Sequence, residues 1–207
     1  MKKESKNIIA LFCCLSLLFI CCNKRNFFPD PDDPGLSRLT SRGYNIITMY
    51  INNVPYINSY RKPIFGGINN TLPIITKRIT NSAFDTLQIS WQIEINNTSA
   101  GYNQSYNSIS LLLPVSKSFS ARDFLAMNGK RFPTDSNAIA VNYFYNYPDT
   151  LIGKSNIYFI GIKYNSSGNS SNSTYSLSGL FNGNIGDSIL ITKGRFDFEI
   201  DAATLNF

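Results

Sequence analysis

Two carboxylates near the end of the chain have a spacing that could support acid–base chemistry. Asp197 and Glu199 stand two positions apart in an alternating stretch, so on a β-strand their side chains would share one face. Glycoside hydrolysis needs two carboxyl groups about 5 to 10 Å apart across a cleft. A pair on a single strand face is more typical of solvated surface, and we therefore name no catalytic residue.

The composition argues against several other kinds of catalysis. The 207 residues contain no histidine, which removes Ser-His-Asp and Cys-His mechanisms and the usual zinc and copper ligand sets. All four cysteines lie in the first 22 residues, so we expect no thiolate site in the rest of the chain. We predict a protein that is not an enzyme, with no metal site and no cofactor.

The 12 tyrosines supply the candidate binding residues. Tyr143, Tyr145 and Tyr147 alternate and would share one strand face, and Tyr102 and Tyr106 lie in a polar stretch. Aromatic rings that carry a polar group suit both sugar stacking and protein interfaces. The alternative is that the three alternating tyrosines face inward on a half-buried sheet, since aromatic residues favour strands.

The first 22 residues have the order of an export signal. Three lysines precede an apolar stretch over residues 8–20, whose 13 residues are too few for a membrane span of about 20. The stretch runs into Leu17-Leu18-Phe19-Ile20-Cys21-Cys22, which resembles the lipobox of bacterial lipoproteins. The resemblance implies a signal peptide over residues 1–21 and attachment of acyl chains such as palmitate at Cys22. A plain cleaved signal or a short anchor is the alternative.

Residues 22–42 are predicted to be a tether that joins the lipid to a domain over residues 43–207. Pro29-Asp30-Pro31-Asp32-Asp33-Pro34-Gly35 favours an extended spacer over helix or strand. Its acids also resemble the surface-export signals of Bacteroidetes-type lipoproteins. We expect the protein in the cell envelope, at the outer membrane, with the side that it faces left open. Basic residues form isolated pairs such as Lys130-Arg131, which argues against a nucleic-acid partner.

Strand patterns dominate residues 43–207. From Asp85 to Asn96 apolar residues alternate with polar ones, which indicates one buried and one wet face and places Trp91 in the core. We predict an all-β fold: a single antiparallel β-sandwich, or a barrel-like domain, of about nine or ten strands with one short helix. The expected strands cover residues 44–51, 54–57, 72–79, 85–96, 109–115, 138–147, 156–164, 174–181, 188–192 and 195–200.

Local signals predict the turns between these elements. Asn52-Asn53 suits a two-residue hairpin, and Pro55 places the following strand at an edge. Ser120 can cap a helix over residues 121–127, which Asn128-Gly129 would end. Lys193-Gly194 is expected to join the last two strands.

Two segments resemble a group of small, uncharacterised lipoproteins from Bacteroidetes. Met49-Tyr50-Ile51-Asn52-Asn53-Val54-Pro55-Tyr56 is similar to their first hairpin, and residues 186–200 run into a similar closing Phe-x-Phe strand. The resemblance implies a secreted β domain and brings no catalytic residues. Three Asp-Ser/Thr-apolar triplets also resemble the O-glycosylation site of exported Bacteroidetes proteins, although such pairs are common at strand starts. The candidate acceptors are Thr86, Thr150 and Ser188.

These patterns favour a membrane-anchored lipoprotein whose non-enzymatic domain binds a glycan or a protein partner at the cell envelope. The first alternative is a structural or assembly subunit of a surface fibre or of a secretion or transport complex. Its partner site would be the sheet edge near Pro55. The second alternative is a carboxylate-dependent glycoside hydrolase.

Overall fold

The computed structural model describes most of the region that was expected to form the β domain. The described residues are 29–59, 73–80, 82–95, 105–134, 138–143, 150–166, 173–186, 189–205 and 207. Ten strands and two short helical elements lie in these ranges. They are β1 (Ile46–Ile51), β2 (Val54–Ser59), β3 (Ile74–Arg78), β4 (Asp85–Ile95), β5 (Ser105–Val115), α2 (Ala121–Leu125), β6 (Arg131–Phe132), β7 (Ala138–Tyr143), β8 (Thr150–Asn165), β9 (Thr174–Ile185), β10 (Ile189–Asp201) and the 3-10 turn η2 (Ala202–Thr204).

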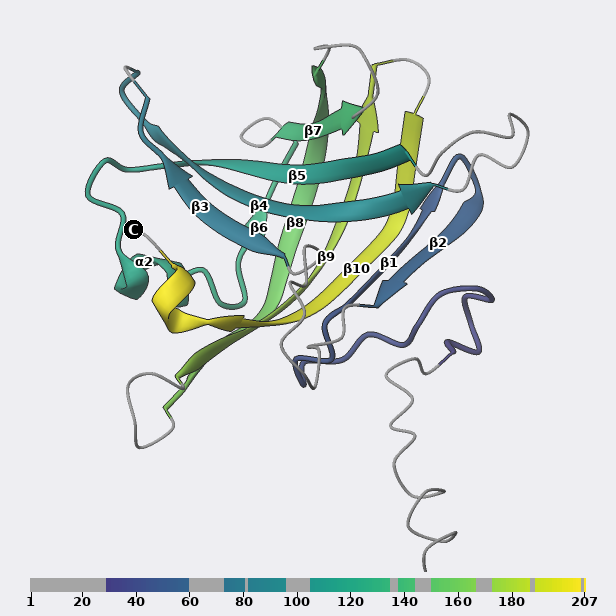
Figure 1. Cartoon of the computed structure of the whole chain (residues 1–207), viewed down its shortest axis with the longest axis horizontal. Coiled ribbons are helices and arrows are strands. Elements are labelled where there is room, and N and C mark those ends of the chain that lie inside the picture. The colour runs from purple at the N-terminus through teal and green to yellow at the C-terminus, as the bar shows by residue number, and fades with distance from the viewer. Residues whose placement is uncertain are drawn as a thin grey trace, which may run out of the picture.

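The strands form two antiparallel layers. Hydrogen bonds follow the order β2-β1-β10-β9-β8-β7-β5-β4-β3, and β6 pairs with β8 outside this path. The larger layer holds β2, β1, β10, β9, β8 and β6, and the smaller layer of β5, β4 and β3 lies across it (Figure 1). β7 pairs with both β5 and β8 and therefore joins the layers. In the described part of the chain β2 and β3 do not pair, so the fold is sandwich-like and open, and the predicted all-β fold class is confirmed.

Aromatic side chains hold the two layers together. Trp91 on β4 is 1% exposed, and its ring centroid lies 5.5 Å from that of Phe181 on β9 and 6.1 Å from that of Phe198 on β10. The predicted apolar face of β4 is confirmed up to Trp91, because Leu87, Ile89 and Trp91 are all buried. Trp91 is therefore a core residue, as its place in the pattern predicts. The expectation that the other face is wet is wrong for Gln88, which is buried and bonds to Ser90 and Ser110.

The helix closes one end of this core. Phe124 on α2 is fully buried, with its ring 5.8 Å from Tyr175 and 5.4 Å from Phe207. The helix begins after Ser120, whose backbone N–H and hydroxyl both donate to the Asp123 carboxylate, and these bonds lower the pKa of Asp123. The predicted cap is thus confirmed, although the α-helix ends at Leu125.

The first hairpin matches its prediction, whereas the last two expected strands are in fact one. Asn52 and Asn53 have φ of 50° and 65° between β1 and β2, and β2 lies at the edge of the sheet. The turn expected at Lys193-Gly194 is wrong. Lys193 has φ of 51°, but its backbone N–H donates to Asn182 Oδ1 at 2.7 Å, and the register with β9 shifts between Ile191 and Gly194. The pair therefore makes a bulge inside β10, and the strand continues in the same direction.

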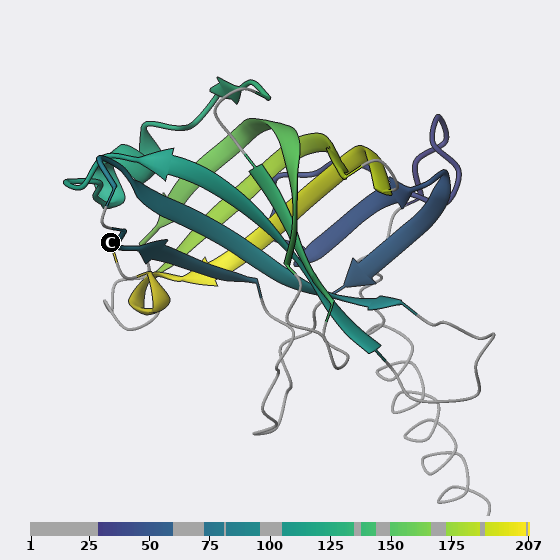
Figure 2. The same cartoon turned by 90° about the horizontal axis from the view of Figure 1, so that it is seen from above.

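The spacer predicted over residues 22–42 does not hold for the part that the structure describes. Residues 29–45, here called the strap, lie against the outer face of β10 on the β1–β2 side of the larger layer (Figure 1 and Figure 2). Arg195 forms ion pairs with Asp30 and Asp33 and donates to the carbonyl of Ser37 at 2.9 Å. Acids that look like solvated spacer in the sequence are therefore bound to a largely buried arginine.

The bonds of the strap shift the pKa of one of its carboxyls. The backbone N–H of Asp32 donates to Asp30, and the Arg195 side chain bonds to the same carboxylate. Together these bonds lower the pKa of Asp30 from its ordinary value of 3.8. Because the pKa of Asp30 is lower in the folded than in the unfolded state, the ionised carboxylate stabilises the fold at any pH above the unfolded-state pKa. This stabilisation is lost as the pH falls through the folded-state pKa.

Trp91→Ala should lower the free energy of unfolding by about 3 to 5 kcal/mol, because it removes the contact between the layers and leaves a cavity. Urea unfolding followed by circular dichroism measures this loss. Ile79→Ala is the matched control, since Ile79 is 85% exposed and its truncation should change the free energy by about 0.5 kcal/mol or less. A loss for Trp91→Ala no larger than that of the control would contradict the assignment of Trp91 to the interlayer contact.

Asp30→Asn should be less stable than the parent at pH 6, and the difference should shrink as the pH falls towards 3. As the pH falls towards and below 3.8, the unfolded parent takes up a proton on Asp30 before the folded parent does, so the stabilisation by this carboxylate declines, whereas the amide does not titrate. The measurement is the urea midpoint of both proteins at each pH. Asp32→Asn is the control, because no described residue bonds to the Asp32 carboxylate. A difference that stays constant from pH 6 to pH 3 would show that the Asp30 contact does not stabilise the fold.

Candidate functional site

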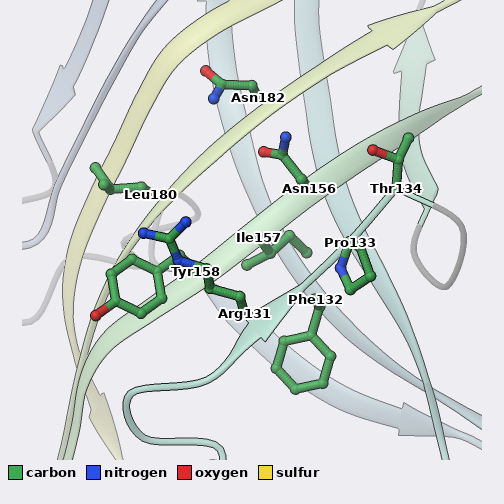
Figure 3. Close-up of a pocket in the computed structure, with 9 residues that line it drawn as sticks. All are labelled: Arg131, Phe132, Pro133, Thr134, Asn156, Ile157, Tyr158, Leu180 and Asn182. Atoms are coloured by element: carbon green, nitrogen blue, oxygen red, sulfur yellow. The ribbon is translucent and has the colours of Figure 1, made fainter.

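A pocket of about 390 Å³ opens on the outer face of β8 and β9, at the place where β6 runs along the edge of β8 (Figure 3). Its volume lies in the range of small-ligand sites, about 300 to 1,000 Å³. It is larger than the pocket of about 140 Å³ between β3 and the end of β10. The lining residues are Arg131, Phe132, Pro133, Thr134, Asn156, Ile157, Tyr158, Leu180 and Asn182.

Strand register builds the floor of the pocket. Asn156 on β8 stands opposite Asn182 on β9, and Tyr158 stands opposite Leu180 two residues further along. Side chains at alternate positions share one face, so the two amides and the tyrosine–leucine pair all point outward. Figure 3 shows Asn156 and Asn182 on these two neighbouring strands. The floor thus combines two amides with one apolar pair.

Residues 131–134 form the wall of the pocket. Backbone hydrogen bonds and one aromatic contact hold this wall in place. The Gly129 N–H donates to the carbonyl of Phe159 at 2.9 Å, and the Phe159 N–H donates to the carbonyl of Lys130 at 3.0 Å. The Phe132 ring packs edge-on against Phe159, with the centroids 5.8 Å apart. Because Phe159 is a fully buried core residue, the wall is tied to the rigid part of the fold.

Arg131 places a positive charge over the floor. Its guanidinium carbon lies 4.9 Å from the centroid of the Tyr158 ring, within the range of a cation–π contact. No described carboxylate pairs with Arg131, and none of the nine lining residues is acidic. Lys154 projects from the same face of β8 two residues before Asn156 and is exposed. The pocket therefore carries a positive charge, and its lining combines Arg131 and a few amide and hydroxyl groups with apolar side chains.

The two amides of the floor are differently engaged. Asn182 accepts the Lys193 N–H through its Oδ1, which fixes the orientation of the amide, and no described residue bonds to its nitrogen. The Asn156 side chain is exposed and bonds to no described residue. A ligand can therefore use donors and acceptors of both side chains without breaking the sheet.

The acidic pair that the sequence singled out has a different environment from the one expected. Asp197 is 1% exposed, and it accepts bonds from the Thr40 hydroxyl and from the backbone N–H groups of Arg42 and Gly43, at 3.2 Å and 2.7 Å. The strap therefore buries Asp197, and the expectation of a solvated face is wrong for this residue. Glu199 accepts the Thr174 hydroxyl at 3.1 Å.

A second pocket, of about 140 Å³, lies between β3 and the end of β10. It brings Glu199 and Asp201 next to apolar residues of β3, and its volume is below the range of small-ligand sites. Among the described residues no three acidic side chains come together as a metal site would require. The lining residues are Pro73, Ile74, Ile75, Glu199, Ile200, Asp201 and Thr204.

Most of the site residues predicted from the sequence lie wholly or partly outside the described part of the chain. Cys22, Tyr102, Tyr145, Tyr147 and Ser188 lie outside the described residues. The backbones of Tyr106, Tyr143 and Thr150 lie in strands, but their side chains are outside the described part. Thr86 is half-buried in β4, where it stands opposite Arg78 and Pro114.

Sequence reasoning missed the pocket residues. Lys130-Arg131 looks like one of several exposed basic pairs, and Asn156 and Tyr158 look like ordinary residues of a strand. Only the register of β8 with β9, and the position of β6 beside β8, bring these side chains together.

In the described ranges no helix is both long and apolar enough to cross a membrane. The chain matches no protein-family model, no curated protein and no solved structure.

Proposed function

We propose that this chain is a membrane-anchored, non-enzymatic lipoprotein that binds a glycan in the pocket between β6, β8 and β9. The observation that carries the proposal is the pair of outward amides, Asn156 and Asn182, beside the guanidinium of Arg131. An amide can donate and accept at once, which suits the hydroxyl groups of a sugar. A site that uses few polar groups on a rigid sheet loses little entropy when it binds.

The volume and the position of the pocket support a glycan as the ligand. About 390 Å³ is enough for one or two sugar residues of an oligosaccharide, and the pocket opens on an outer face that a long chain can cross. Leu180 and the Phe132 wall add apolar surface that can contact the C–H groups of a sugar ring. The remainder of a longer glycan would lie along the exposed positions of β8.

The anchor in this proposal is Cys22, and the strap sets how far the domain can move from it. Six residues lie between Cys22 and Pro29, the first residue of the strap, so even a fully extended chain spans only about 25 Å from Cys22 to Pro29. A tether over residues 22–42 would allow a reach of about 70 Å. The docked strap thus favours a domain held near the membrane surface.

An assembly subunit is the second candidate function, because β2 is an edge strand with exposed apolar side chains. Val54 is 53% exposed and Ile57 is 46% exposed, and among the described strands β2 pairs only with β1. A partner strand added to this edge would form main-chain hydrogen bonds. A stoichiometric protein partner recovered from solubilised membranes would favour this second function.

Asn156→Ala should weaken glycan binding about threefold to tenfold, the loss expected for one or two hydrogen bonds. A glycan array probed with the full chain in detergent identifies a bound oligosaccharide, and calorimetry with that oligosaccharide measures the affinity. Asn184→Ala is the matched control, because Asn184 is an exposed asparagine of β9 that does not line the pocket. Equal affinities of the two variants would place the binding site elsewhere, and no retained glycan would overturn the proposed function.

Cys22→Ala should abolish lipid attachment and release the protein from the membrane. The experiment expresses parent and variant in a lipoprotein-processing bacterium, labels them with palmitate and separates detergent and aqueous phases. The parent is expected in the detergent phase with label, and the variant in the aqueous phase without it. Cys21→Ala is the control and should behave like the parent. A labelled Cys22→Ala protein in the detergent phase would refute the assignment of the anchor.

A further inference from the structure

We infer that the pocket selects an acidic sugar residue, whose anionic group binds the guanidinium of Arg131. The inference rests on the proposed glycan function and names the class of sugar that the pocket prefers. Three observations support it: the position of Arg131, the lack of a described carboxylate beside it, and the placement of the amides.

The first observation is that the Tyr158 ring positions the guanidinium. At 4.9 Å the Arg131 guanidinium covers one face of the ring, so that face holds a cation and cannot stack a sugar. Stacking also restricts the side chain before a ligand arrives, and a planar guanidinium fixed in this way can give two parallel bonds to a carboxylate. Tyr158 therefore acts as a positioning residue for Arg131.

The second observation is that the ion pairs and hydrogen bonds of the described carboxylates involve groups other than Arg131. Asp30 and Asp33 pair with Arg195, and Asp33 also pairs with Lys193. Asp85 lies 3.7 Å from Lys77, and Asp123 bonds to the helix cap. No described acid offsets the charge of Arg131, and Lys154 adds a second positive charge on the same face. An anionic ligand would supply a counter-charge that no described residue provides.

The third observation is the arrangement of the donors. The guanidinium lies beside the Tyr158–Leu180 pair. The two amides, Asn156 and Asn182, lie two residues away from this pair along β8 and β9. A sugar with its anionic group at Arg131 would place ring hydroxyls towards Asn156 and Asn182 (Figure 3). With a neutral sugar in the pocket, no described group would pair with the charge of Arg131.

The test compares neutral, uronate-containing and sulfated oligosaccharides on one array, with the full chain in detergent. The parent should retain acidic oligosaccharides in preference to neutral ones, and the uronate and sulfate arms identify the anionic group. Arg131→Gln should weaken binding of the retained acidic oligosaccharide about tenfold or more, while Arg131→Lys should lose less. Arg122→Gln is the control, because Arg122 is an exposed arginine of α2 outside the pocket.

A second pair of variants tests the positioning role of Tyr158. Tyr158→Phe keeps the ring and should bind like the parent, whereas Tyr158→Leu should reduce the preference for acidic over neutral oligosaccharides. Equal retention of neutral and acidic oligosaccharides, with a loss on Asn156→Ala, would overturn this inference and leave the proposed function standing. An Arg131→Gln affinity equal to that of Arg122→Gln would also overturn it. Retention of no oligosaccharide would overturn the proposed function itself.

Discussion

The fold depends on aromatic side chains that meet between the two layers. Trp91 contacts Phe181 and Phe198, and no other described contact involves so large a side chain from the smaller layer. Such close packing needs room on the neighbouring strands. Gly179 and Gly194 provide it, since a Cβ at either glycine would lie 2.4 to 2.5 Å from a ring atom of Phe196 or Phe181. Burial of these rings is the main force that holds the sandwich together.

The inner face of β10 packs in the core, and its outer face carries charged side chains. The strap covers these charged side chains. Arg195 and Asp197 alternate with Phe196 and Phe198, so they point away from the core. A largely buried charge is costly unless it is paired and hydrogen-bonded. The strap supplies carboxylates for Arg195, and it supplies a hydroxyl and backbone N–H groups for Asp197. The acids near the N-terminus and the charges near the C-terminus therefore form one structural unit.

The bulge at Lys193 links this unit to the candidate pocket. Its backbone N–H donates to Asn182 on the pocket floor, while its ammonium group pairs with Asp33 of the strap and has its pKa raised by that carboxylate. The strap bonds to β1 and β10, and the pocket lies further along the same layer on β8 and β9. The outer face is thus divided between a segment of the chain itself and a positively charged pocket that can accept a ligand.

The sequence by itself determined most of the elements, because their signals are local, although it predicted neither β6 nor the continuity of β10. Alternation in β4, positive φ at Asn52-Asn53, the Ser120 cap and the edge position of Pro55 each depend on a few adjacent residues. Only the tertiary structure decided which faces are covered and which side chains meet. Asp30 and Arg195 are 165 positions apart, and Arg131, Tyr158 and Asn182 come from three strands. Strand register and layer packing bring such residues together, and local sequence patterns do not encode either.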